Sequence, residues 1–158
     1  AKGIGPAKSL EMAAAFEIGK RLAKGKSIAP LLDTPERVYA VYGAEFMGLR
    51  QESLRALFLD ARFRLIRAEE ITRGSVSECM AHPREIFRQA MIHSAYAVVV
   101  LHNHPSGDPA PSAADIRVTR SLREAAQLLQ INLVDHIILG SPDGGRVPYY
   151  SFKEAGHL

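Results

Sequence analysis

Histidine, serine and aspartate side chains that can do chemistry are concentrated in one stretch, His102–Asp115. His102 and His104 follow a continuous apolar run, Tyr96–Leu101, which predicts a strand buried on both faces. Because residues two apart on a strand point to the same side, both imidazoles can face one point. Asp115 falls in the first turn of a predicted helix, where the helix dipole favours a carboxylate. Two imidazoles and a carboxylate suit Zn²⁺ and leave a fourth position for water, which is the arrangement of a catalytic site.

Simpler structural roles remain open for several of these residues. Ser112 and Asp115 have the spacing of a capping box, in which a serine and an acid satisfy free N–H groups at a helix start. Asp108, in the loop, is nearer to the histidines in sequence than Asp115 is. His136, on a predicted strand, is either a hydrogen-bonded core histidine or a support for a metal ligand. The residue types alone therefore indicate a metal site without assigning every group in it.

Helices and strands alternate along the rest of the chain. Helical spacing predicts the inward faces of two helices, which carry Ile86, Phe87, Ala90 and Met91 in one and Ile116, Thr119, Leu122, Ala126 and Leu129 in the other. The predicted helices follow the turn Gly3–Pro6, begin at the N-cap Thr34 and at His82, and span Ser112–Gln130. The predicted strands are Ser53–Leu59, Phe63–Ile71, Tyr96–Leu101, Ile131–Leu139 and Arg146–Phe152. This alternation predicts an α/β fold with a mixed central sheet flanked by helices.

The length and composition indicate one main globular domain with a short segment before it. The chain has 158 residues, of which 47% are hydrophobic and 23% charged, and this balance argues against disorder. Lys26–Leu32 is predicted as a linker, which divides the chain into a short helical segment, residues 1–30, and a main domain, residues 31–158. The net charge of +3 resides in the N-terminal segment, where basic residues predominate.

The single cysteine and the lack of long apolar stretches favour a soluble, cytoplasmic protein. With Cys79 alone, the chain cannot form an internal disulfide or a zinc site with two thiolates. No apolar run reaches the length of a membrane span, and no signal peptide opens the sequence. We therefore expect no membrane contact, whereas the oligomeric state is left open by the sequence.

The spacing of four residues resembles a known metalloprotease motif. His102-x-His104, seven residues, Ser112, two residues and Asp115 is similar to the JAMM motif of the MPN+ superfamily. The surrounding segments resemble the bacterial RadC family, and these are residues 82–87 (HPREIF), 102–108 (HNHPSGD), 111–112 (PS) and 135–138 (DHII). Residues 3–8 (GIGPAK) are similar to the hairpin of that family's helix-hairpin-helix segment, which is only partly present. The resemblance covers essentially the whole chain and implies the three-layer, deaminase-like architecture of JAMM domains.

The resemblance implies roles for the four motif residues. His102, His104 and Asp115 match the ligands of one zinc ion per chain, and Ser112 matches the serine that hydrogen-bonds water or the developing oxyanion. The implied activity is zinc-dependent hydrolysis of an amide bond, of the peptidase or isopeptidase type. The implied partner is a protein or peptide substrate, whose identity the sequence does not reveal.

A glutamate upstream of the motif is the remaining part that the resemblance implies. It acts as general base in that family and lies at an early strand. Glu52 is the best match because it directly precedes the predicted strand Ser53–Leu59, and Glu69 and Glu70 on the next strand are the competitors.

Two other classes of function remain open. Backbone N–H groups at Gly3 and Gly5, with Lys2 and Lys8 beside them, can contact phosphates, which favours a weakly DNA-binding protein or a metal-dependent nuclease linked to DNA repair. A non-catalytic MPN interaction module is the other alternative. A zinc deaminase is excluded, because that class needs His-x-Glu and two further cysteines, whereas this chain has Cys79 alone.

Overall fold

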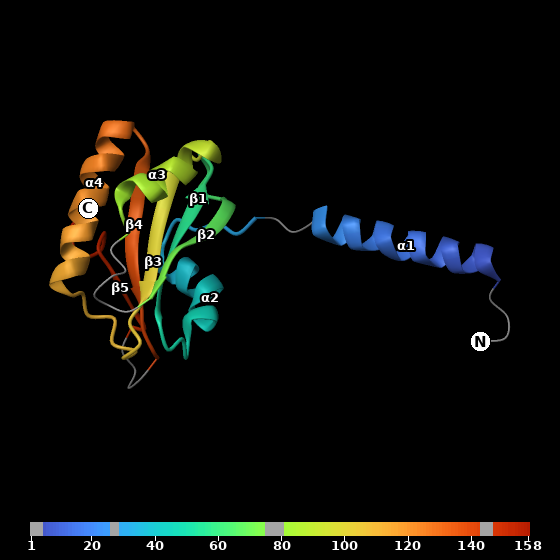
Figure 1. The fold of residues 1–158 in the computed structure, drawn as a ribbon, viewed down its shortest axis with the longest axis horizontal. Coiled ribbons are helices and arrows are strands. Elements are labelled where there is room, and N and C mark those ends of the chain that lie inside the picture. The colour runs from blue at the N-terminus through green and yellow to red at the C-terminus, as the bar shows by residue number, and fades with distance from the viewer. Residues whose placement is uncertain (1–4, 26–28, 75–80, 143–146) are drawn as a thin grey trace.

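The computed structural model describes residues 5–25, 29–74, 81–142 and 147–158 (Figure 1). The elements follow in the order α1 (Pro6–Gly25), α2 (Pro35–Phe46), β1 (Glu52–Leu59), β2 (Leu65–Gly74), α3 (Pro83–Ile92), β3 (Ala97–Asn103), α4 (Ala113–Leu129), β4 (Asn132–Leu139) and β5 (Tyr149–Ser151). The alternation of helices and strands predicted from the sequence is confirmed. The predicted N-caps are also confirmed, since the side chains of Thr34, His82 and Ser112 each accept a backbone N–H of the helix that follows.

The described strands form one mixed sheet in the order β2-β1-β3-β4-β5. β1 runs antiparallel to both β2 and β3, β3 and β4 are parallel, and β5 returns antiparallel to β4. Helix α4 makes the connection between the two parallel strands, as a crossover of this kind requires. The helix therefore begins beside the end of β3, where the two motif histidines lie.

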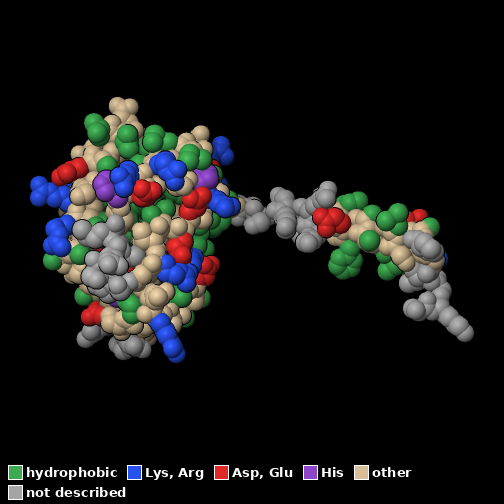
Figure 2. Space-filling model, in the orientation of Figure 1, with side chains coloured by type: hydrophobic (Ala, Val, Ile, Leu, Met, Phe, Trp, Pro, Cys, Tyr) green, Lys and Arg blue, Asp and Glu red, His purple; other side chains and the backbone are tan. Residues whose placement is uncertain are grey.

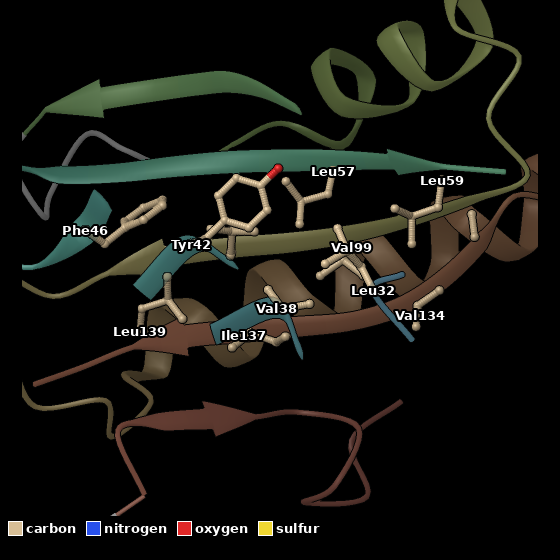
Figure 3. Packing of buried hydrophobic residues seen from close by; sticks show 12 residues of the cluster. Leu32, Val38, Tyr42, Phe46, Leu57, Leu59, Val99, Val134, Ile137 and Leu139 are labelled. Carbon is tan, nitrogen blue, oxygen red and sulfur yellow. The ribbon is translucent and has the colours of Figure 1, made fainter. Parts of the chain in front are cut away.

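Helices cover both faces of the sheet, so the predicted three-layer α/β fold is confirmed. Helix α2 lies on one face, and α3 and α4 lie on the other (Figure 1). Alternate residues of β3 enter the two cores, with Val99 and Leu101 facing α2 and Val98 and Val100 facing α3 and α4. Figure 3 shows the core beneath α2, which includes Val38, Tyr42, Phe46, Leu57, Leu59, Ile137 and Leu139.

The predicted inward faces of α3 and α4 need correction. Met91, Ile116 and Leu129 were expected inside, but they are 57%, 45% and 42% exposed. The buried residues of α4 are Asp115, Thr119, Leu122 and Ala126. In this helix, the prediction is confirmed for Thr119, Leu122 and Ala126 and is wrong only for Ile116 and Leu129, which lie at the flanks of this row.

Several predicted boundaries also shift. The predicted linker ends earlier, because Leu31 bridges Arg64 and Leu32 is fully buried in the core. β3 extends through His102 and Asn103, two residues beyond the end of the predicted strand Tyr96–Leu101. The further changes lie at the ends of strands: β1 begins at Glu52 itself, β2 runs over Leu65–Gly74, and β5 is limited to Tyr149–Ser151.

The N-terminal segment forms the predicted helix, α1, but its described side chains are exposed. Leu10 and Phe16 are 73% and 84% exposed, and Figure 2 shows apolar side chains on the surface of this helix. Among the described residues, no helix is long and apolar enough to cross a membrane. Cys79 lies outside the described residues, as does part of the predicted strand Arg146–Phe152.

Candidate metal centre

The fold brings His102, His104 and Asp115 together at one end of the sheet. His102 is on β3, His104 directly follows that strand, and Asp115 is in the first turn of α4. Each residue offers one ligand atom, and these atoms all lie within 4.8 Å of one another. The three residues predicted as metal ligands therefore form one cluster that could hold a metal ion.

The spacing of the donor atoms fits a small tetrahedral ion. The two imidazole Nε2 atoms are 3.3 Å apart, and Asp115 Oδ1 is 3.2 Å from Nε2 of His102. Asp115 Oδ2 is 3.4 Å from Nε2 of His104. Ligand bonds of about 2.0–2.1 Å at tetrahedral angles give donor separations of about 3.3–3.4 Å. The Nε2–Nε2 separation is close to this value, and so are the two carboxylate–imidazole separations, which involve different oxygens of Asp115.

A chain of hydrogen bonds orients the His102 imidazole. The Thr119 hydroxyl donates to the carbonyl of Asp115 at 2.7 Å, so it accepts from Nδ1 of His136, which is 2.6 Å away. Burial lowers the pKa of His136 well below its ordinary value, and the ring is therefore neutral. Nε2 of His136 then accepts from Nδ1–H of His102 at 2.9 Å. With Nδ1–H committed to His136, the Nε2 atom of His102 faces the cluster.

His136 thus combines the two roles that the sequence left open. It is a buried core histidine, 1% exposed, with its ring stacked on Phe152 at a centroid distance of 4.8 Å. It also lies directly behind a predicted metal ligand. The register explains this placement, because β4 pairs in parallel with β3 and sets His136 opposite Val100, two residues before His102.

His104 is oriented by the loop that follows it. Its Nδ1 donates to the carbonyl of Asp108 at 2.9 Å, which leaves Nε2 for the cluster. The Asp108 carboxylate instead accepts the N–H of Ala110, so this residue shapes the loop and is not part of the cluster. Gly107 has φ +78°, and its carbonyl accepts the N–H of Ser141, which anchors the loop to the end of β4.

Ser112 and Asp115 form the capping box and belong to the candidate site at the same time. The Asp115 carboxylate accepts both the N–H and the hydroxyl of Ser112, and its own N–H donates to the Ser112 hydroxyl. Burial works to raise the pKa of Asp115, but hydrogen bonds from His102, His104 and Ser112 hold it well below its ordinary value. The hydrogen bond with Asp115 likewise raises the pKa of His104. The carboxylate is therefore ionised and aimed at the imidazoles.

Glu52 is the candidate glutamate that lies at the cluster. It is the first residue of β1 and 7% exposed, and its Oε1 is 4.0 Å from Nε2 of His102. Burial raises the pKa of this carboxyl group above its ordinary value. The two competitors are engaged elsewhere: Glu69 pairs with His93 at 2.7 Å, and Glu70 bonds to Arg73 and Ser53.

A cleft of about 400 Å³ opens over the cluster. Its polar lining includes Glu52, His104, Ser112 and Asp115, and its apolar walls include Leu54, Ala114 and Val118. A second hollow, of about 190 Å³, shares the segment 104–106 with this cleft and continues between α2 and the end of β4. The segment 104–106 therefore borders both hollows.

The predicted phosphate-contacting residues are only partly described. Lys2 and Gly3 lie outside the described residues. Gly5 precedes α1 and its carbonyl accepts the N–H of Ser9, while Lys8 is exposed on the helix. The predicted nucleic-acid contact therefore stays a prediction.

The structure is thus a three-layer α/β domain with two histidines and an aspartate, a group that could hold a metal ion, at one end of its sheet and next to a buried glutamate. The chain belongs to the RadC-like JAB domain family, whose profile matches residues 32–157. It is similar to a UPF0758 protein of Shouchella clausii, with 42% identity over 98% of this chain and 65% of the relative. A UPF0758 protein of Geobacter sulfurreducens is 41% identical over 99% of this chain and 67% of its own. The chain thus spans about two thirds of the length of these relatives, whose names state no activity.

Proposed function

We propose that this chain is a zinc-dependent hydrolase that cleaves an amide bond in a protein or peptide substrate, as a peptidase or isopeptidase. The observation that carries the proposal is the close approach of two imidazoles and a carboxylate. The two Nε2 atoms are 3.3 Å apart, and those of His102 and His104 lie 3.2 and 3.4 Å from Oδ1 and Oδ2 of Asp115, respectively. Nitrogen and oxygen donors at this spacing suit zinc, and three protein ligands leave a position open for water or substrate. The RadC-like JAB family supports a metal-dependent hydrolase of this general kind.

The proposal assigns a role to each group around the cluster. Zinc held by His102, His104 and Asp115 supplies Lewis acidity, which activates water and polarises the substrate carbonyl. Glu52 accepts a proton from water and donates it to the leaving amine, and its raised pKa suits both transfers. The Ser112 hydroxyl lines the same cleft, and we assign it as the donor to the developing oxyanion, for which it turns its proton away from Asp115.

The shape of the site favours a polymeric substrate. The main cleft and the second hollow share residues 104–106 as lining, and we propose that an extended polypeptide occupies both. The apolar walls at Leu54, Ala114 and Val118 favour uncharged side chains near the scissile bond.

The test is hydrolysis of fluorogenic peptides, in one set with linear peptide bonds and in another with isopeptide bonds to a lysine Nζ. We expect the zinc-loaded wild type to cleave members of at least one set. Glu52→Gln should retain zinc and lose cleavage, because an amide cannot accept the proton. Glu124→Gln, at a surface residue on α4, is the matched control and should cleave like the wild type.

Two outcomes contradict the proposal. Cleavage by Glu52→Gln at the wild-type rate would remove Glu52 from the reaction. Zinc binding with no cleavage in either set, or no zinc binding at all, would instead favour the non-catalytic MPN interaction module.

A further inference from the structure

The side chain of Asn103 joins the strand of the metal ligands to the strand of the general base. Asn103 lies between His102 and His104 in the sequence. Its Oδ1 accepts the backbone N–H of Ser53 at 3.0 Å, and its Nδ2 donates to the backbone carbonyl of Gln51 at 3.3 Å. These two backbone groups flank Glu52 on either side.

The contact occurs where the regular pairing of β1 and β3 stops. The register of these strands ends at the pair Leu54–His102, whereas β1 itself begins two residues earlier, at Glu52. In an extended chain, the carbonyl of residue 51 and the N–H of residue 53 point to the same side. A carboxamide has an acceptor and a donor side by side, so Asn103 continues the ladder by one rung with its side chain.

Burial makes this rung important. Asn103 is 3% exposed and Ser53 is 1% exposed, so water is poorly placed to replace the hydrogen bond between them, whereas the bond to the carbonyl of the exposed Gln51 is partly buried. A leucine or alanine at position 103 offers no polar group, and an aspartate can accept from Ser53 but cannot donate to Gln51. Asparagine satisfies both backbone groups at once.

We propose that Asn103 is a positioning residue that holds Glu52 at the metal cluster by clamping the backbone on both sides of it. The strand segment 102–104 then has two tasks. Asn103, in the middle, fixes the position of Glu52, whereas His102 and His104 on either side face the metal cluster. The distance between the general base and the ligands is thereby set by one short segment of chain.

This inference rests on the proposed function for the importance of Glu52, but the clamp itself is measured without a substrate. The variants are Asn103→Ala and Asn103→Asp, and the matched control is Asn132→Ala, an exposed asparagine at the start of β4. The first readout is the rate of amide hydrogen exchange at Ser53, which is monitored by NMR on the zinc-loaded protein. The second is modification of Glu52 by a water-soluble carbodiimide, followed by peptide mass spectrometry.

In Asn103→Ala, we expect exchange at Ser53 to accelerate about tenfold, because a buried N–H loses its acceptor. Carbodiimide modification of Glu52 should rise several-fold, while modification of the buried Asp135 stays at the wild-type level. Zinc content should be retained, because both histidines are still present. In Asn103→Asp, the exchange rate at Ser53 should stay close to that of the wild type, and the carbodiimide modification of Glu52 should lie between those of the wild type and Asn103→Ala. Asn132→Ala should change none of these readouts.

Unchanged exchange at Ser53 in Asn103→Ala would overturn the clamp. Equal increases in modification at Glu52 and Asp135 would show general loosening instead of positioning, and loss of zinc would assign Asn103 to support of the ligands. If the wild type cleaves a peptide, kcat should fall in Asn103→Ala, and adding this change to Glu52→Gln should cost nothing more. If the wild type cleaves nothing, the proposed function fails while exchange and modification still decide the clamp.

Discussion

Replacing Thr119 with valine removes the last member of the hydrogen-bond chain behind His102 and keeps the side-chain shape. Thr119 is 2% exposed. Its hydroxyl makes two hydrogen bonds, one to the carbonyl of Asp115 at 2.7 Å and one with Nδ1 of His136 at 2.6 Å. Leaving the buried N–H of His136 unpaired should lower the free energy of unfolding by about 1–3 kcal/mol.

The larger consequence concerns the metal. Without its acceptor, His136 can move its proton to Nε2, which requires Nδ1 of His102 to become an acceptor. Nε2 of His102 then carries the proton and is lost as a ligand. Loss of such a supporting contact typically lowers metal affinity about 10–100-fold. We therefore expect zinc affinity to fall by that factor in Thr119→Val.

The assay is zinc competition with a chromophoric chelator, combined with urea unfolding of the metal-free protein. Thr34→Val is a matched control, because it removes the N-cap of α2 and should lower stability by about 1 kcal/mol with no change in zinc affinity. A Thr119→Val protein that loses stability but keeps wild-type zinc affinity would refute the reasoning that links Thr119 through His136 to His102.

Three further predictions concern the framework and the N-terminal segment. Burial raises the pKa of the Asp135 carboxyl above its ordinary 3.8, so the folded state retains this proton more strongly than the unfolded state. The free energy of unfolding, measured relative to Asp135→Asn, should fall as pH rises above 3.8, and a flat difference would contradict this. Gly107→Ala places a Cβ 2.6 Å from Ser141 Oγ at φ +78° and should destabilise the protein by about 1–3 kcal/mol in urea unfolding; wild-type stability would contradict the described loop. Deletion of residues 1–26 should abolish a weak, salt-sensitive shift on DNA, and an undiminished shift would place the contact elsewhere.

The sequence supports the fold and the donor set well, for physical reasons. The valine-rich run before His102 has the character of a strand buried on both faces, and β3 is buried along its whole length. His102 and His104 share a direction because strand residues alternate, and the position of Asp115 follows from the helix start at Ser112. These features depend on local spacing, so they can be recognised without the tertiary structure.

The supporting residues depend on contacts between distant segments, and the sequence does not display these. Thr119 and Asn103 were missed because their partners, His136 and the backbone around Glu52, are reached only through the register of the sheet. One local signal was present: Asp115 and Thr119 are polar residues four apart that interrupt the apolar row of α4. The predicted inward row included Thr119 but gave it no partner, and it also included Ile116, which is 45% exposed.

Metal content tests the central claim most directly. Elemental analysis should be made on untagged protein purified without added metal or chelator, for the wild type, His104→Ala and His157→Ala, the last being a histidine outside the donor cluster. The account predicts one zinc ion per chain in the wild type and in His157→Ala, and none in His104→Ala. Wild-type protein that takes up no zinc even after reconstitution, or His104→Ala protein with an unchanged zinc content, would contradict it.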